Sequence, residues 1–501
     1  MDSSGTRVPG APGTGDAAAD SAPSATAPAG PAPTPEGTAP TASGDGAAAP
    51  QSTPAGPAPK KKDRHLYQID FVRLVTFAGV VLDHVILSIA SSTEIVAQGI
   101  GLLLRYTRYC FFALTGFVLT YQYRNRELHA PTFWRRRFKL IGLPFLTWSL
   151  FYWVYNRYRR GGLDELQSIV DSTESIRLAL KSIAYDLITG HAAYHLYFLS
   201  VSMQIYVVFP AVLWVLKRTW GYHRYLLLVS GTFHIWLLYH MVRPPLQIFS
   251  DGFLGVIWRY LGITLLPYQF FILAGCLAAY HFEGFGAFMK RYKWPLALGS
   301  LVAIIVTLVY YRSEMHAGEE TFRATNVFMV HNAFAYIGII VLLYLGGTLW
   351  QNRRSPGSIA DTLMRKAADR SFAIYLAHVL AIFSIMPLVN HWAAANGWRI
   401  LVTYLIVCVM TVFLVEVLRL SPVSLITTGR NRLDWREQNP LRQLPIAAGS
   451  IAVGLILWYG DWASSKSLGQ FFLGTGLLLV IGAGAVLYRR RTDRNETPAA
   501  V

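Results

Sequence analysis

Arg73 and His84 are the residues in this sequence best suited to chemistry, and they lie in one apolar segment with ten residues between them. On an α-helix, eleven steps of ~100° and ~1.5 Å return to within about 20° of the same face and rise about 16 Å. One helix face therefore carries a guanidinium near one membrane surface and an imidazole near the middle of the bilayer. A charge at such depth costs at least ~2.5 kcal/mol on insertion scales, so we interpret both residues as functional.

The chemistry open to this face is anion binding at one end and proton transfer at the other. Asp70 and Arg73 are three residues apart and can pair, which would hold the guanidinium where it meets the phosphates of a cofactor. Apolar surroundings favour the neutral form of His84, which a general base requires. Asp83 points about 100° away, so we do not expect it to orient His84. The alternatives are an arginine that snorkels to the interface and a histidine that only hydrogen-bonds between helices.

The elements that position these residues are membrane helices. Stretches of about twenty apolar residues, the length that crosses a bilayer, recur along the 501-residue chain, and 53% of its residues are hydrophobic. We therefore predict an all-α polytopic membrane protein. The expected membrane segments are 66–90, 100–123, 138–156, 194–216, 224–242, 255–281, 294–311, 325–349, 371–391, 399–419, 445–461 and 469–488.

The distribution of charge predicts the topology. The formal net charge is +17, and Lys and Arg are about three times as numerous in one set of alternate loops as in the other. This is the positive-inside pattern, which favours a plasma-membrane protein with both termini in the cytoplasm over a nucleic-acid-binding protein. The long outer loop 157–193 contains a periodic run that predicts an interfacial helix, either lining a substrate entry or serving as a plain connector.

Two further groups of residues carry weaker signals. Arg108 lies one turn before Phe112 in the second segment and can face the same cavity as His84, or pack at an interface. Cys110, Cys276 and Cys408 sit in apolar segments without CxxC spacing, so we expect buried, unpaired thiols and no metal site.

Five sequence elements occur in order along the chain. They are Ile69-Asp70-x-x-Arg73 followed by His84, then Phe111-Phe112-Ala-Leu-Thr115-Gly116-Phe117, a basic run from Phe133 to Pro144 that contains Arg135, Arg136 and Arg137, His195-Leu-Tyr-Phe-Leu, and Ser371-x-x-x-Tyr375-Leu-Ala-His378. In this order they resemble the acyltransferase 3 family of membrane acyltransferases, over roughly residues 66–420. Many members carry Glu-Glu-Gln where this chain has Ser202-Met203-Gln204, so no carboxylate stands at that position.

The resemblance implies a mechanism and a set of site residues. His84 and Arg73 would be catalytic, with His84 removing the proton of an acceptor hydroxyl as it attacks the thioester of an acyl-CoA, or else carrying the acyl group itself. The donor would be cytoplasmic acyl-CoA, with acetyl-CoA expected, and no metal. The substrate-binding residues would be Asp70, Arg108, Arg135, Arg136, Arg137, His195, Gln204, Tyr375 and His378. His65 and Asp70 also fit the His-x4-Asp pattern of soluble acyltransferases, which we attribute to chance.

These observations predict the organisation of the chain. Residues 1–64 form a disordered, Ala- and Pro-rich cytoplasmic tail, and 65–420 form a ten-helix transmembrane acyltransferase domain. A cytoplasmic linker, 421–444, then leads to a C-terminal two-helix hairpin with a basic tail, 445–501. The first membrane helix is expected to act as an uncleaved anchor.

The predicted function is a membrane O-acyltransferase. It would move an acyl group from acyl-CoA to a hydroxyl of a carbohydrate, glycoconjugate or related acceptor, such as a glycolipid or a secondary metabolite. Its other partner would be the lipid bilayer. The alternative is a transporter or exporter of a polysaccharide or acylated product. A transporter is expected to show internal repeats with paired Gly or Pro breaks, and the two halves of this sequence show no convincing repeat.

Overall fold

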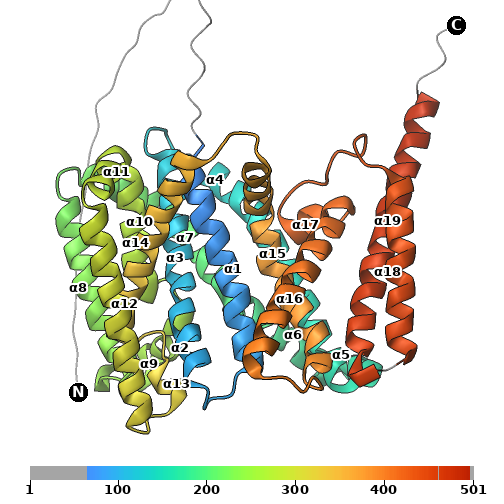
Figure 1. Cartoon of the computed structure of the whole chain (residues 1–501), viewed down its shortest axis with the longest axis horizontal. Helices are drawn as coiled ribbons and strands as arrows, with labels where there is room; N and C mark the ends of the chain where they lie inside the picture. Colours follow the sequence, from blue (N-terminus) through green and yellow to red (C-terminus); the bar gives the residue numbers. More distant parts are fainter. Residues whose placement is uncertain (1–64, 461, 497–501) are drawn as a thin grey trace, which may run out of the picture. The chain divides into compact units, whose positions relative to one another are not determined.

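Helices and their connections make up the whole of the described chain. The structure is a computed structural model that describes residues 65–460 and 462–496, and no residue in these ranges lies in a β-strand. The predicted tail, 1–64, lies outside the described residues. Figure 1 shows the helices running roughly side by side, with α4 (Ala130–Arg137) and α11 (Phe282–Arg291) at the end where α1 begins.

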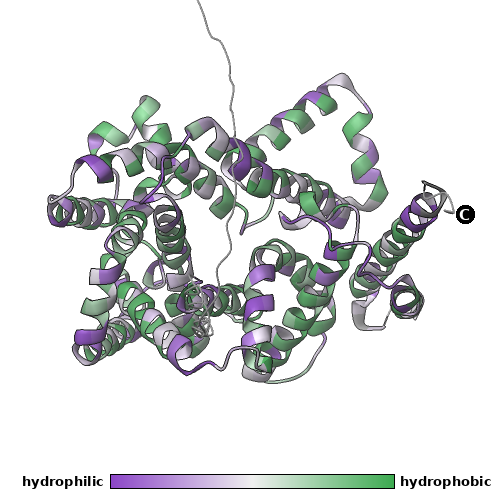
Figure 2. Cartoon of the chain, turned by 90° about the horizontal axis from the view of Figure 1, so that it is seen from above, coloured by the Kyte–Doolittle hydropathy of each residue, from purple (hydrophilic) through white to green (hydrophobic). Residues whose placement is uncertain are grey.

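Nine helices within 65–460 and 462–496 are long and apolar enough to cross a membrane. They are α1 (Tyr67–Ile89), the pair α2 (Ile95–Leu104) and α3 (Tyr106–Tyr123) counted as one, α7 (Tyr197–Arg218), α12 (Lys293–His316), α14 (Val330–Arg353), α15 (Ile359–Val389), α16 (Asn396–Leu420), α18 (Pro440–Gly460) and α19 (Lys466–Glu496). The chain is therefore an integral membrane protein. Hydrophobic residues, green in Figure 2, dominate these helices when they are viewed nearly end-on.

Three of the predicted membrane segments are not among these nine helices. The segments near 138–156 and 224–242 are helical, in α5 (Leu143–Gln167) and α8 (His223–Met241). The segment predicted at 255–281 is broken into α9 (Gly252–Arg259), two short 3-10 turns and α10 (Gln269–Tyr280), and α10 meets α11 at a bend of 98°. Counting α5, α8 and α10 with the long helices before α18 completes the predicted ten-helix core, which the α18–α19 hairpin follows.

The break before α10 has a local cause and a local compensation. Pro267 lacks the N–H that a continuous helix would need, and Thr264 is extended. Within a bilayer the freed backbone groups must find partners in the protein. The Gln204 side chain of α7 provides them, because its Nε2 donates to the Ile263 oxygen at 2.9 Å and its Oε1 accepts from the Leu265 nitrogen at 3.1 Å.

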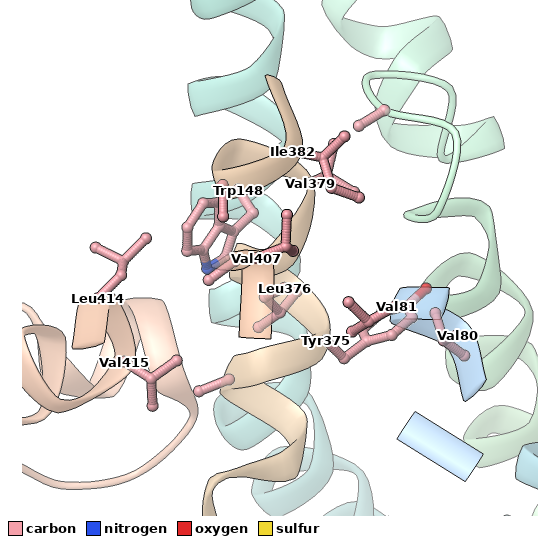
Figure 3. Packing of buried hydrophobic residues seen from close by; sticks show 14 of the residues in the cluster. Val80, Val81, Trp148, Tyr375, Leu376, Val379, Ile382, Val407, Leu414 and Val415 are labelled. Carbon is pink, nitrogen blue, oxygen red and sulfur yellow. The ribbon is translucent and has the colours of Figure 1, made fainter. Parts of the chain in front are cut away.

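The centre of the bundle is the packing of α15 against its neighbours. Figure 3 shows Leu376 and Val379 of α15 between Val81 of α1, Trp148 of α5 and Val407 of α16, and all of these side chains are buried. Close packing of this kind carries much of the helix association in a membrane, where lipid tails are as apolar as leucine. It also holds α1 and α15 rigidly together, so polar groups on their facing sides keep a defined separation.

Small residues let α3 and α10 approach closely. A Cβ added to Gly275 would lie 2.0 Å from the Ala113 oxygen, and one added to Gly116 would lie 2.4 Å from the Ile272 oxygen. Only glycine fits at such a crossing. The three cysteines are unpaired, as predicted, with Cys110 and Cys276 buried and Cys408 half-buried.

The region between α16 and α18 is more structured than a plain linker. It contains the short helix α17 (Ser424–Thr428), which contacts α5, α15 and α16. The following helix, α18, begins at Pro440, so the last five residues of the predicted linker, 440–444, belong to the hairpin. In the loop 157–193 a helix forms, as expected: α6 (Thr173–Thr189), which begins at the Ser172 cap and exposes Leu178 and Leu180.

Candidate active site

His84 of α1 and His378 of α15 form the centre of the site. Nδ1 of His84 and Nε2 of His378 share a hydrogen bond of 2.8 Å, and the two rings are nearly parallel, with centroids 5.0 Å apart. His84 is half-buried, whereas His378 is fully buried. The two residues come from helices that pack directly on each other, so the structure brings together two predicted site residues.

Hydrogen bonding assigns the protons on this pair. Nδ1 of His378 lies 2.7 Å from the Tyr375 carbonyl oxygen, and a carbonyl only accepts, so Nδ1 of His378 must donate. In a neutral His378 the other nitrogen, Nε2, then accepts, and Nδ1 of His84 donates to it. The lone pair of His84 is thereby left on Nε2. This nitrogen makes no hydrogen bond within the described part of the chain, and it can take up a proton.

His195 is a third imidazole beside this pair. Its ring centroid lies 5.1 Å from that of His378, and both of its ring nitrogens are buried without a hydrogen-bond partner among the described residues. The Tyr375 hydroxyl donates to the backbone oxygen of His195, which ties the start of α7 to α15. An unpaired buried imidazole costs about 1–3 kcal/mol, so this position is suited to receive a polar ligand or a water.

A cavity of about 180 Å³ surrounds the accessible side of His84. Its polar lining comes from Asp83, His84, Thr107, Arg108, Tyr194, His195, Tyr197 and Tyr375. Arg108 therefore faces the same cavity as His84, and its guanidinium lies 5.4 Å from the Tyr197 ring centroid. Asp83 makes no hydrogen bond with His84, as expected, but its carboxylate lines this cavity, which we did not expect.

A second cavity, of about 220 Å³, adjoins the first toward the end where α1 begins. Its charged lining is Arg73, Arg137, Asp369 and Arg430, and Phe111, Phe198 and Tyr375 line both cavities. The three rings lie within 6.4 Å of one another, centroid to centroid, so they pack together and form the wall between the two spaces. Below we call this second space the central cavity. Its lining also includes Thr115 and Ser371, so residues from all five sequence elements meet there.

Arg73 also lines a third, outer cavity of about 760 Å³. There Asp70 lies 3.7 Å from Arg73, which confirms the predicted ion pair. The Asp70 carboxylate also accepts a hydrogen bond from His65. The two residues of the His-x4-Asp match are therefore in contact, although Arg73 separates them from His84 along α1. Arg124 and Arg126 add further positive charge to this outer space.

The remaining predicted residues divide between the cavities and other roles. Arg137 lines the central cavity and donates to the Gln122 oxygen at 2.8 Å. Arg135 and Arg136 are exposed on α4 and line none of the three cavities. Gln204 likewise lines none of them, since its side chain is engaged with the backbone before α10.

Sequence reasoning missed Arg430 and the cavity-lining role of Asp83. Arg430 follows a short helix in a polar segment with no periodic pattern, so nothing in the sequence pointed to the central cavity. Asp83 was set aside because it is a poor partner for its neighbour His84, but a cavity wider than one helix face accommodates both. Among the residues that the structure describes, no group of three or more His, Cys, Asp or Glu is placed to hold a metal ion.

Comparison with known proteins identifies the matched part of the chain. A family model described as an acyltransferase domain, acyltransferase 3, matches residues 66–419, which run from the start of α1 almost to the end of α16. Arg430 and the α18–α19 hairpin lie beyond the match. No curated protein and no solved structure matches the chain.

Proposed function

Because the chain belongs to the acyltransferase 3 family, whose model covers residues 66–419, we propose that this membrane acyltransferase is an O-acyltransferase that uses acyl-CoA. It would transfer the acyl group, acetyl in the first instance, to a hydroxyl of a carbohydrate, glycoconjugate or related acceptor. One observation carries the proposal. The free lone pair of His84 lies at the inner end of a series of cavities that starts among guanidinium groups. The family match also favours transfer over the alternative of an exporter.

The cavities suit the shape and charge of a CoA thioester. Arg73 is shared by the outer and central cavities, and guanidinium groups bind phosphates with paired hydrogen bonds. The Phe111, Phe198 and Tyr375 rings separate the central cavity from that of His84, so they would move apart to admit the pantetheine arm and bring the thioester beside His84. The end where α1 begins carries the more basic set of loops. By the positive-inside rule we place that end and both termini on the cytoplasmic side of the cell membrane, where CoA is available.

The His84–His378 pair supports general base catalysis. As the acceptor oxygen bonds to the thioester carbon, its proton passes to Nε2 of His84. The imidazolium that forms keeps its Nδ1–H bonded to Nε2 of His378. Collapse of the tetrahedral intermediate breaks the carbon–sulfur bond, and the proton on His84 passes to the leaving thiolate to give CoA thiol. A positioned base of this kind contributes about 10² to 10⁴ in rate.

Arg108 and the polar residues around it support the rest of the reaction. The Arg108 guanidinium lines the same cavity as His84 and is the nearest fixed cation for the oxyanion of the intermediate. Tyr194, His195 and Asp83 offer the donors and acceptors that a hydroxyl-rich acceptor needs. An acyl-histidine intermediate on His84 would use the same lone pair and the same oxyanion partner.

Ligand-dependent thermal stability in nanodiscs tests the proposal. Acetyl-CoA, longer acyl-CoAs and free CoA are titrated into the wild type, Arg73→Ala and His84→Ala. We expect a stabilising shift that Arg73→Ala abolishes and His84→Ala retains, since only the first change removes a phosphate contact. The absence of a shift with every thioester would contradict a CoA-dependent transferase.

A further inference from the structure

Arg430 lies eleven residues beyond the matched domain, yet its side chain lines the central cavity with Arg73 and Arg137. The charges of Arg73 and Arg430 repel each other across this space. The segment 421–439 between α16 and α18 therefore contributes a cation to the same cavity as the first-helix arginine.

The backbone that carries Arg430 is held in place on several sides. Gly429 is left-handed, with φ of 67°, and an added Cβ would lie 2.3 Å from the Leu140 oxygen. Trp148 of α5 donates to the Thr427 oxygen at 2.8 Å, and the Ser424 hydroxyl donates to the Arg430 oxygen at 3.0 Å. Arg430 is thus presented from a fixed turn that packs on the segment leading into α5.

The C-terminal hairpin fixes the other half of the same segment. Arg432 donates to the Leu420 oxygen and to the Gly482 oxygen of α19, both at 2.7 Å. Arg490 of α19 donates to the Gln438 oxygen at 2.7 Å. The hairpin also packs on α15 and α16. These bonds connect the added helices to the turn that presents Arg430.

The charge around Arg430 is incompletely neutralised. The central cavity holds three guanidinium groups and one carboxylate, Asp369, a net charge of +2. Asp369 is shared, because it lies 3.2 Å from Arg430 and 3.0 Å from Arg370. The Arg430 side chain remains 59% exposed, so some of its five N–H donors are available to a ligand.

We propose that Arg430 binds a phosphate group of the CoA donor, so that the 421–439 segment is part of the donor site. The identity of the ligand rests on the proposed function, whereas the placement of the cation does not. Arg430 would be a binding residue and would take no part in proton transfer, because its cavity is separated from that of His84 by the Phe111, Phe198 and Tyr375 rings.

The test compares CoA affinity of four full-length proteins in nanodiscs: wild type, Arg430→Gln, Arg430→Lys and the matched control Arg436→Gln. Arg436 lies in the same segment, is exposed and lines none of the three cavities. We expect about tenfold weaker CoA binding for Arg430→Gln, partial recovery with lysine, and a change of less than about twofold for Arg436→Gln. Wild-type affinity in Arg430→Gln, or an equal loss in Arg436→Gln, would overturn the proposal.

Asp369→Asn provides a readout in the opposite direction. Removing this carboxylate frees Arg430 for the ligand, so CoA should bind about threefold more tightly, a gain that misfolding cannot produce. In the Arg430→Gln background the gain should shrink, because the freed partner is absent. An equal gain in both backgrounds would show that Arg430 does not contact the ligand. If the wild type itself binds no CoA, the proposed function fails, which is distinct from any failure of Arg430 alone.

Discussion

Nδ1 of His84 and Nε2 of His378 lie 2.8 Å apart, although 294 positions separate the two residues in the chain. His84 is the donor in this bond, because Nδ1 of His378 donates to the Tyr375 carbonyl oxygen and leaves Nε2 of His378 as the acceptor. This leaves Nε2 of His84 as the free acceptor, on a residue that lines the cavity of about 180 Å³. In the proposed mechanism His378 is therefore a positioning residue, which would select the tautomer and the orientation of the base without contacting the substrate itself.

Replacement of the base separates chemistry from binding. In His84→Ala, we expect kcat for acyl transfer to fall by about 10² to 10⁴, because the proposed general base is lost, while CoA affinity stays within about twofold. Single-turnover kinetics and CoA titration in nanodiscs measure the two quantities. A parallel loss of CoA affinity would place His84 in the donor site instead.

Replacement of His378 tests the positioning role. His378→Phe fills the same space but leaves the Nδ1–H of His84 without its acceptor, so kcat should fall about tenfold with an unchanged KM for the donor. His378→Gln, whose side-chain oxygen can accept this bond, should recover part of the loss. If the glutamine variant is as poor as the phenylalanine variant, the hydrogen bond is not what matters at this position.

The arginines of α4 are predicted to differ in how much each contributes to CoA binding. Arg137→Ala removes a guanidinium from the central cavity and should weaken CoA binding about tenfold. Arg135→Ala removes an exposed guanidinium and should weaken CoA binding by no more than about twofold. The comparison uses CoA titration at one ionic strength, since surface charges act over a Debye length of about 10 Å at 0.1 M salt. Equal effects would restore the simpler view that the whole basic run binds phosphate.

Gly429→Ala should destabilise the protein through its turn. The left-handed backbone costs a non-glycine residue about 1–2 kcal/mol, and overlap of the new Cβ with the Leu140 oxygen adds about 1–3 kcal/mol. Gly357→Ala is the matched control, because Gly357 is also left-handed, with φ of 80°, but its Cβ would meet no atom within 4 Å. Thermal unfolding in one detergent should rank Gly429→Ala below Gly357→Ala, and the reverse order would contradict the close contact.

Gln204 is a case where the structure indicates a different role from the sequence. Gln204→Leu should lower the free energy of unfolding by about 1–3 kcal/mol, because the Ile263 oxygen and the Leu265 nitrogen lose their partner where water is scarce. The KM for donor and acceptor should change less than twofold. A stable Gln204→Leu protein with a raised KM would instead support the substrate-binding role that the family resemblance implied.

The helical core could be predicted well because its signals are local. Apolar length located α1, α7 and α16 to within a few residues, since crossing a bilayer sets a minimum run. The same rule overestimated the regularity of 255–281. Hydrophobicity does not register that Pro267 lies at the start of a new helical turn or that a side chain on α7 can bond to the backbone at the break.

The sequence by itself determined the face of α1 that carries Arg73 and His84, because eleven residues return to the same side of any α-helix. It also determined which loops are basic. Only the tertiary structure decided that His378 meets His84, that Arg137 and not Arg135 reaches the central cavity, and that Arg430 joins them from beyond the matched domain. These proximities depend on how the helices pack against one another. Packing is decided by complementary surfaces that lie far apart in the chain, so neither segment alone has a sequence pattern that indicates its partner.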